Sequence, residues 1–122
     1  MRRIDRAFAE NFAREWIAAW NSRDVELVLS HYADDVELSS PLIATYGGEP
    51  SGRLTGKSQI RAYWNTCLQA VPDLKLELLA ILLGVGNTVA VQYRSLNGRL
   101  ALEVFEFGER GTVMRASVFY AA

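Results

Sequence analysis

The dipeptide Asn97-Gly98 constrains the fold of this chain more than any other feature, because it separates two runs of strand-forming residues. A type I′ turn needs two residues that tolerate positive φ, and Asn-Gly is the strongest short-range signal for a hairpin built on it. The flanking runs, residues 88–96 and 100–107, are therefore predicted to pair as antiparallel strands. Part of the core must then be built on a sheet.

Glu103 is the residue of this hairpin that points to chemistry. Side chains alternate across a strand, so Glu103 shares one face with the rings of Phe105 and Phe107. Counting back from a two-residue loop places Gln92 opposite Glu103 and Arg94 opposite Ala101, on the same face and two residues nearer the turn. If this face lines a cavity, the three polar groups form the convergent polar spot typical of a small-molecule pocket. If it is a solvated sheet end, Arg94 and Glu103 form an ordinary surface pair.

The N-terminal half is predicted to be mainly helical. Apolar residues recur at helical spacing in segments 5–21, 25–32 and 57–71. Between the second and third of these helices, an alternating strand is expected over residues 36–40. The Gly- and Pro-containing segment 42–56 that follows is typical of a long loop, and long ordered loops in small domains often rim a site.

The C-terminal half is predicted to be all strand. Beyond the central hairpin, strands are expected over residues 74–83 and 112–120, with turns between them. The continuous apolar run at 79–83 indicates a strand that becomes covered on both faces toward its end. The expected fold class is therefore α+β, in one domain over residues 1–122.

Composition excludes several classes of function. The chain has 122 residues and a formal net charge of −1, with no basic stripe of the kind that nucleic-acid binding needs. Charges interrupt the apolar residues too often for a bilayer span or an export signal. A single cysteine, Cys67, and a single histidine, His31, form no cluster at metal-ligand spacing. We therefore expect a cytoplasmic protein without metal or cofactor, and without nucleic-acid or membrane partners.

Five segments together resemble a known family. They are residues 16–21, 31–36, 40–41, 56–64 and 104–107. With the order of the predicted elements, they resemble the NTF2-like superfamily, and within it the SnoaL-like branch. The resemblance covers nearly the whole chain. It implies a cone, in which three N-terminal helices pack in a strongly curved antiparallel β-sheet and leave a cavity.

Within that superfamily the chain is also similar to ketosteroid isomerases, which use an Asp base with a Tyr and a protonated Asp as oxyanion donors. The match places Ser40 at the position of the base, Trp16 at the oxyanion tyrosine and Glu103 at the protonated acid. A serine hydroxyl cannot take an α-proton as a carboxylate can, so steroid isomerisation by the same mechanism is not expected. The other pocket aromatics of the isomerase fall on Tyr32, Trp64 and Tyr120.

Two further relatives imply other chemistry. Limonene epoxide hydrolase uses an Asp-Arg-Asp arrangement around a water molecule. Here Arg94 and Glu103 would supply two members, and Gln92 is the nearest third without being an acid. Polyketide cyclases of the SnoaL type use a single pocket acid, a role that Glu103 would fill.

Three functions stay open at this point. The first is an isomerase or cyclase-type enzyme that binds a small apolar organic molecule in the cone and uses Glu103 for proton transfer, with Arg94 and Gln92 beside it. The second is a non-catalytic ligand-binding or dimerisation module, and the third is a hydrolase of the epoxide hydrolase type. The residues expected to contact the ligand are Trp16, Tyr32, Ser40, Trp64, Phe105 and Tyr120. Trp16, Tyr32, Trp64 and Tyr120 also have a plain interpretation as core packing, and Ser40 as the end of a strand.

The outward face of the hairpin suggests a partner. In the predicted register this face carries Val91, Tyr93, Leu102 and Val104, and such an apolar surface needs a cover. NTF2-like relatives commonly pair through this sheet face. A homodimer through the outer sheet face is therefore expected.

Overall fold

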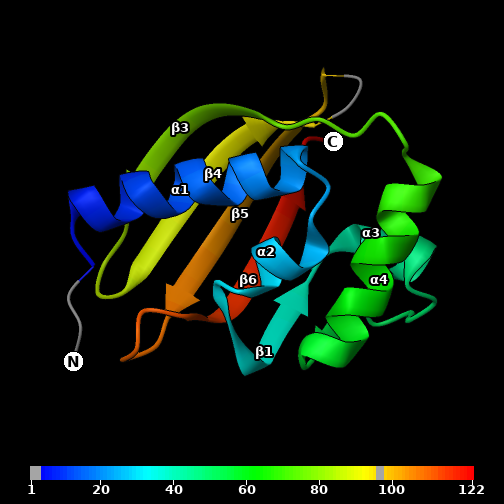
Figure 1. The fold of residues 1–122 in the computed structure, drawn as a ribbon, viewed down its shortest axis with the longest axis horizontal. Coiled ribbons are helices and arrows are strands. Elements are labelled where there is room, and N and C mark those ends of the chain that lie inside the picture. The colour runs from blue at the N-terminus through cyan, green and yellow to red at the C-terminus, as the bar shows by residue number, and fades with distance from the viewer. Residues whose placement is uncertain (1–3, 96–97) are drawn as a thin grey trace.

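One curved β-sheet with helices on its concave face forms the body of the protein in the computed structural model, which describes residues 4–95 and 98–122 (Figure 1). Hydrogen-bonded neighbours give the strand order β2-β1-β6-β5-β4-β3. In chain order the elements are α1 (Arg6–Asn21), α2 (Val25–Leu29), β1 (Tyr32–Ser39), α3 (Pro41–Tyr46), β2 (Arg53–Thr55), α4 (Lys57–Ala70), β3 (Glu77–Leu83), β4 (Thr88–Arg94), β5 (Leu100–Phe107) and β6 (Val113–Tyr120).

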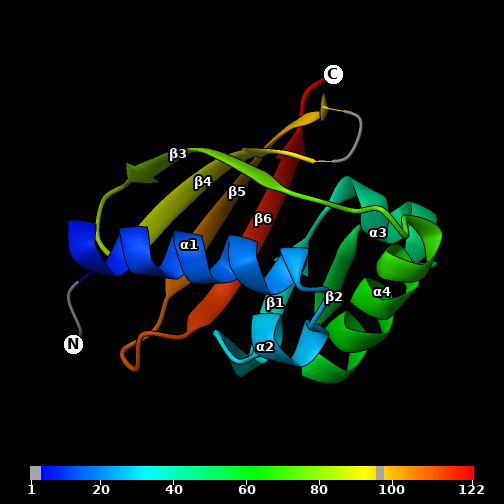
Figure 2. The same cartoon turned by 45° about the horizontal axis from the view of Figure 1, so that its top comes forward.

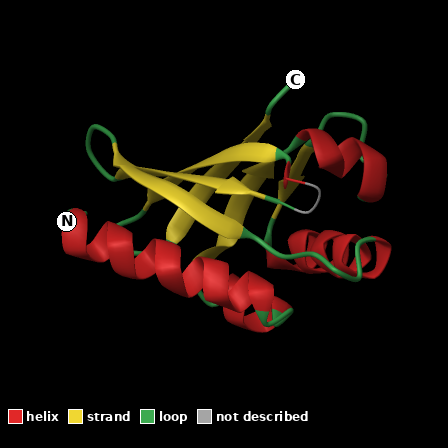
Figure 3. Ribbon diagram, turned by 90° about the horizontal axis from the view of Figure 1, so that it is seen from above, coloured by secondary structure: helices red, strands yellow, loops and turns green. Residues whose placement is uncertain are grey.

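The expected α+β architecture is confirmed. Helix α1 lies across one face of the sheet, and α3 and α4 stand beside the end formed by β1 and β2 (Figure 2, Figure 3). Strands β3 to β6 form an antiparallel meander, as predicted. One pair departs from the expected antiparallel pattern, because β1 runs parallel to β6. The long stretch of chain between these two strands supplies the crossover that a parallel pair requires.

Helix α1 buries an aromatic stripe against the sheet, as its apolar spacing predicts. The side chain of Asp5 caps the first turn by accepting a hydrogen bond from the backbone N–H of Phe8 at 2.9 Å. Phe12 and Trp16 meet the ring of Phe105 edge to face, with centroids 4.8 and 5.2 Å apart. Such pairs add about 0.5–1.5 kcal/mol each beyond the burial of apolar area. These contacts fix α1 across β5.

Helix α4 also matches its predicted extent. It begins after Gly56, whose φ of 88° is open to glycine but strained for other residues, and it ends at Ala70 before Pro72. Its buried face consists of Ile60, Tyr63, Trp64 and Leu68. No helix formed by residues 4–95 or 98–122 is long and apolar enough to cross a bilayer.

The chain leaves α2 earlier than the sequence pattern predicts. The helix ends at Leu29, and Tyr32, which the apolar spacing places on the helix, begins β1. The backbone N–H of Val113 donates to the carbonyl of His31 at 2.9 Å, so the chain begins to pair with β6 at this point. Because Tyr32 is 2% exposed and would be buried in either conformation, its burial does not distinguish helix from strand.

Segment 42–56 is more regular than a loop. It contains most of α3 and all of β2. Pro41 occupies the first turn of α3, where its missing N–H has no helical partner to lose. The hydroxyl oxygen of Ser40 caps this helix by accepting a hydrogen bond from the backbone N–H of Leu42 at 3.3 Å. Ser40 therefore starts a helix as well as following a strand.

Strand β3 is not covered on both faces. It lies at the edge of the sheet, and Leu79, Leu82 and Leu83 are 41%, 49% and 52% exposed. A register shift between Leu78 and Ala80 interrupts its pairing with β4. The prediction from the apolar run 79–83 is therefore wrong for the chain described. An apolar run alone does not distinguish a central strand from an edge strand.

The β4–β5 hairpin forms, but its register differs by one residue from the prediction. Val91 and not Gln92 pairs with Glu103, and the backbone N–H of Ser95 donates to the carbonyl of Arg99 at 2.9 Å. The N–H of Gly98, which has φ of 71°, donates to the carbonyl of Ser95 at 3.1 Å, as in a three-residue hairpin loop with glycine in the left-handed position. The two-residue turn was predicted from Asn97-Gly98, with Leu96 opposite Arg99, and both Leu96 and Asn97 lie outside the described residues.

We predict that Asn21 stabilises the junction between α1 and β3. Its side-chain N–H donates to the carbonyl of Leu76 at 2.9 Å, and its side-chain oxygen accepts from the N–H of Leu76 at 2.7 Å. Losing two hydrogen bonds of about 0.5–1.5 kcal/mol each should make Asn21→Ala less stable by about 1–3 kcal/mol in urea denaturation. Asn65→Ala, at an exposed position of α4, should not lower stability. Equal stability of the two variants would contradict this role.

Candidate pocket around Glu103

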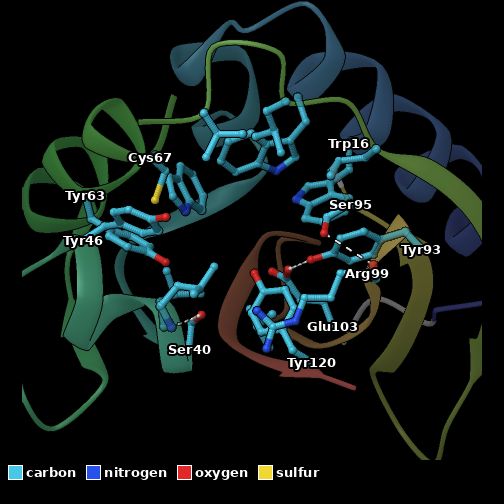
Figure 4. Close-up of a pocket in the computed structure, with 18 residues that line it drawn as sticks. Trp16, Ser40, Tyr46, Tyr63, Cys67, Tyr93, Ser95, Arg99, Glu103 and Tyr120 are labelled. Atoms are coloured by element: carbon cyan, nitrogen blue, oxygen red, sulfur yellow. Dashed lines mark hydrogen bonds between the residues drawn. The ribbon is translucent and has the colours of Figure 1, made fainter. Parts of the chain in front are cut away.

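A cavity of about 270 Å³ lies between the concave face of the sheet, the C-terminal half of α1, and helices α3 and α4. Figure 4 shows Tyr93, Arg99, Glu103 and Tyr120 gathered on one side of it, and Ser40, Tyr46, Tyr63 and Cys67 on the other. The rest of its wall is apolar or aromatic: Trp16, Trp20, Leu38, Leu42, Trp64, Val71, Leu74, Leu76 and Val118, with Ser95 near the hairpin. An apolar cavity with a few convergent polar groups is the usual form of a small-molecule site.

Glu103 is buried in this wall. Its side chain comes from the inner face of β5, and the residue is 4% exposed. Burial raises its pKa to about 8, an effect opposed by the Tyr93 hydroxyl, which donates to Oε1 at 3.3 Å. Glu103 is therefore mainly neutral at pH 7. A neutral carboxyl group can donate a hydrogen bond or a proton, which a carboxylate cannot.

Tyrosine side chains surround Glu103. Burial raises the pKa of Tyr93 and Tyr32 well above the ordinary value of 10, and the pKa of Tyr120 to about 12. The proximity of Glu103 adds to the rise in all three. Tyr32 also accepts a hydrogen bond at 2.9 Å from the indole N–H of Trp16. These phenols stay protonated and are hydrogen-bonding groups, not bases.

The described residues of the opposite wall, Ser40, Tyr46, Tyr63 and Cys67, include no carboxylate or histidine. Burial raises the pKa of the Tyr63 hydroxyl far above its usual range, and the nearby Cys67 adds to the rise, while a hydrogen bond with Ser40 opposes it. Burial likewise raises the pKa of the Cys67 thiol. A protonated thiol is a weak nucleophile, so Cys67 behaves as a small apolar residue here. Tyr63 and Cys67 therefore stay protonated and contribute polar contacts to this wall.

The pocket brings together five of the residues singled out from the sequence: Trp16, Ser40, Trp64, Glu103 and Tyr120. Tyr32 and Phe105 do not line it, because both are fully packed beneath the wall, Tyr32 against Trp64 and Phe105 against Trp16. They support the site from the core.

Gln92 and Arg94 lie away from Glu103, contrary to the predicted arrangement. The one-residue difference in register puts them on the outer face of the sheet, with Gln92 opposite Leu102 and Arg94 opposite Leu100. Arg94 donates to the carbonyl of Gly98 instead. The same shift brings Tyr93 into the pocket. The polar spot is therefore formed by Tyr93 and Glu103.

Several lining residues were not identified from the sequence. Tyr93 would have been found from a three-residue hairpin loop, and Arg99 then follows from its alternation with Glu103 along β5. Tyr46, Tyr63 and Ser95 depend on how α3, α4 and the hairpin end meet in space. No local sequence signal marks them.

Two other features bear on what the protein can hold. The indole N–H of Trp20, which lines the pocket, is buried and has no hydrogen-bond partner among the described residues. His31 lies in a separate cavity of about 410 Å³ with Glu15, 4.0 Å away, and burial lowers its pKa. Within the described part of the chain, no three His, Cys, Asp or Glu side chains come together as metal ligands would.

Comparison with known proteins gives a consistent result. The sequence profile of the SnoaL-like domain matches residues 13–121. A SnoaL-like protein of unknown function from Burkholderia thailandensis is 53% identical, with a TM-score of 0.92 over 99% of this chain and 100% of that one. A putative ketosteroid isomerase from Kribbella flavida is 22% identical, with a TM-score of 0.73 over 95% of this chain and 79% of that one.

A third structure is the epoxide hydrolase/cyclase-like enzyme SalBIII, described for its role in pyran ring formation in the polyether salinomycin. It is 19% identical, with a TM-score of 0.76 over 96% of this chain and 93% of that one. No protein of curated function matches the sequence. At 22% and 19% identity, the Kribbella flavida protein and SalBIII share the fold with this chain, and the comparison shows no more than that.

The burial of Glu103 predicts how stability depends on pH. Its pKa rises from an ordinary 4.5 to about 8 on folding, so between these values the folded state binds the extra proton. The contribution of Glu103 to the free energy of unfolding is therefore complete below about pH 4.5 and is lost as the pH rises to about 8, by up to about 1.4 kcal/mol per pH unit. In urea denaturation from pH 5 to 8, Glu103→Gln should gain stability relative to wild type as the pH rises.

The control for this measurement is Glu106→Gln, which changes an exposed carboxylate three residues further along β5. Its stability should follow the wild-type pH dependence across the same range. If Glu103→Gln also follows the wild-type curve, Glu103 does not hold a proton in the folded state.

Proposed function

This chain belongs to the SnoaL-like domain family, and we propose that its pocket binds a small, mostly apolar organic molecule on which Glu103 performs proton-transfer chemistry of the isomerase or cyclase type. In this proposal the neutral carboxyl group of Glu103 donates a hydrogen bond, and then a proton, to an oxygen of the ligand. The apolar and aromatic wall supplies most of the binding free energy.

The observation that carries the proposal is a neutral acid beside a cavity. Tyr93 donates to Oε1 of Glu103, which leaves the other carboxyl oxygen to bear the proton. A carbonyl oxygen that gains negative charge in a transition state would be stabilised by such a donor, more strongly in an apolar site than in water. The buried N–H of Trp20, which comes from α1, is a further donor in the same pocket.

The alternatives fit the pocket less well. At the base position of the ketosteroid isomerases, this chain has Ser40, whose hydroxyl oxygen caps α3. The hydrolase hypothesis required Arg94 and Gln92 next to Glu103, and both are on the outer sheet face. A non-catalytic ligand-binding module would use the same pocket without proton transfer. The experiments below separate that module from an enzyme.

We predict that the pocket distinguishes a ketone from a hydrocarbon through Glu103. Wild type should bind 2-acetylnaphthalene more tightly than 2-ethylnaphthalene at pH 7, by calorimetry. The affinity for the ketone should fall up to tenfold per pH unit above about pH 8, because ionised Glu103 no longer donates. Glu103→Gln, which keeps an N–H donor but does not titrate, should bind the ketone without this fall. A ketone affinity independent of pH in wild type would contradict the role of Glu103.

Catalysis is tested by exchange of the methyl protons of 2-acetylnaphthalene for deuterium, followed by NMR. If the protein is an enzyme, Glu103 protonates the carbonyl oxygen while a water molecule takes a methyl proton, so wild type should accelerate this exchange. Glu103→Gln should then slow it by roughly 10²- to 10⁴-fold, the usual size of a general acid–base contribution. Binding without accelerated exchange in wild type would favour the non-catalytic module.

The outer face of the sheet supports a proposed homodimer. In the observed register this face carries Leu102 and Val104 of β5, beside Ala90, and it extends to Phe119 on β6 and Leu82 on β3. Phe119 is 55% and Leu82 49% exposed. Val91 and Tyr93, which the predicted register placed on this face, are buried inside. A second copy of the chain would cover this apolar surface.

We predict that Phe119→Glu dissociates the dimer. A carboxylate at the centre of an apolar interface would have to be buried without a partner, so the variant should sediment as a monomer at micromolar concentration while wild type sediments as a dimer. Leu27→Glu changes a similarly exposed leucine on α2, away from this face, and should leave the dimer intact. A wild-type protein that is monomeric under these conditions would contradict the homodimer.

A further inference from the structure

Arg99 is a charged residue at the pocket that the proton-transfer proposal does not use. It directly precedes β5, lines the cavity and is solvent-exposed, so it lies at the mouth. Alternation along the strand places it on the same side as Glu103, four residues further on. Its guanidinium carbon lies 4.7 Å from the centroid of the Tyr120 ring. The guanidinium is thus held beside the pocket by an aromatic face (Figure 4).

Arg99 has no carboxylate partner within residues 4–95 and 98–122. Its hairpin contacts use its backbone: the N–H and the hydroxyl of Ser95 both donate to the carbonyl of Arg99. Other basic side chains form ion pairs with nearby carboxylates: Arg6, Lys57, Arg61 and Arg115. The positive charge of Arg99 therefore faces the mouth without neutralisation.

The net charge of the pocket depends on Arg99 and Glu103. Among the described residues that line it, Glu103 and Arg99 alone carry ionisable acid or guanidinium groups. Glu103 is mainly neutral at pH 7 because it is buried. The pocket consequently presents one positive charge at its mouth and a neutral donor inside. A ligand with a single negative charge at one end complements this arrangement.

We propose that the ligand is an apolar organic acid, whose carboxylate binds Arg99 at the mouth while its apolar body lies in the cavity and an oxygen function contacts Glu103. This rests on the proposed function and adds the class of ligand to it. A guanidinium matches a carboxylate with two parallel hydrogen bonds. The described lining residues offer no second cation for a phosphate dianion, so a carboxylate fits the single charge better.

The test compares two probes of nearly the same shape, the anion 2-naphthoate and the neutral 2-naphthamide, by calorimetry at pH 7 in low salt. Wild type should bind the carboxylate about tenfold more tightly than the amide, the value of one charge-assisted hydrogen bond of about 1.4 kcal/mol. Arg99→Gln should bind both equally, with its amide affinity unchanged. Arg94→Gln, which removes a nearby charge on the outer sheet face, should keep the wild-type preference. Raising the salt concentration should reduce the difference in affinity between the two probes in wild type.

The outcomes separate this inference from the proposed function. If wild type binds the amide but binds the carboxylate no more tightly, the inference is wrong and the small-molecule pocket stands. The inference is also wrong if Arg99→Gln keeps the preference or if Arg94→Gln loses it. If wild type binds neither these probes nor 2-acetylnaphthalene and 2-ethylnaphthalene, the proposed pocket function is wrong, and this inference is wrong with it. Circular dichroism of each variant checks that the fold is intact.

Discussion

The register of the β4–β5 hairpin is the constraint on which the rest of the structure depends. Pairing Val91 with Glu103 puts Tyr93, Glu103 and Phe105 on the concave face, and a slip of one residue between the strands would leave Tyr93 on the face opposite Glu103 and Phe105. The ring of Trp16 packs edge to face against both Tyr93 and Phe105, with centroids 5.4 and 5.2 Å apart. Helix α1 therefore fits the sheet in this register, and the same packing removes water from Glu103.

Burial of an ionised Glu103 would be unfavourable, and in the folded protein the carboxyl group is mainly neutral. An ionised carboxylate in an apolar wall would lose its hydration, and the single hydroxyl donor, from Tyr93, compensates only part of that loss. An apolar side chain of similar size would pack in the same place without this pH dependence. Titratable groups whose pKa is strongly shifted beside a cleft are concentrated at functional sites. The unusual environment of Glu103 therefore favours a role in binding or chemistry over one in stability.

Patterns within single segments predicted the helices and strands of this fold. The composition of the pocket depends on contacts between segments that are distant in the sequence. Helical periodicity was enough for α1 and α4, and alternation within β5 was enough to group Glu103 with Phe105, because both depend on neighbours in the chain. The residue of β4 that pairs with Glu103 depends on whether the hairpin loop has two or three residues, and Asn97-Gly98 alone does not determine this length. The far wall, with Tyr46 and Tyr63, arises where α3 and α4 meet the sheet. No periodicity within one segment encodes such a meeting.

The described lining of the pocket contains one acid and no base, which limits the half of a proton transfer that it can supply. Glu103 can protonate an oxygen, but Ser40 caps a helix, the tyrosines stay protonated, and burial keeps the thiol of Cys67 protonated as well. A proton that leaves the ligand must then go to water, to a group on the ligand itself, or to the Glu103 carboxylate after it has given up its own proton. An isomerase that moves a proton between two carbon atoms needs a base at the site. A ring closure in which one oxygen of the ligand is protonated and another attacks does not, so within the proposed function this arrangement favours cyclisation.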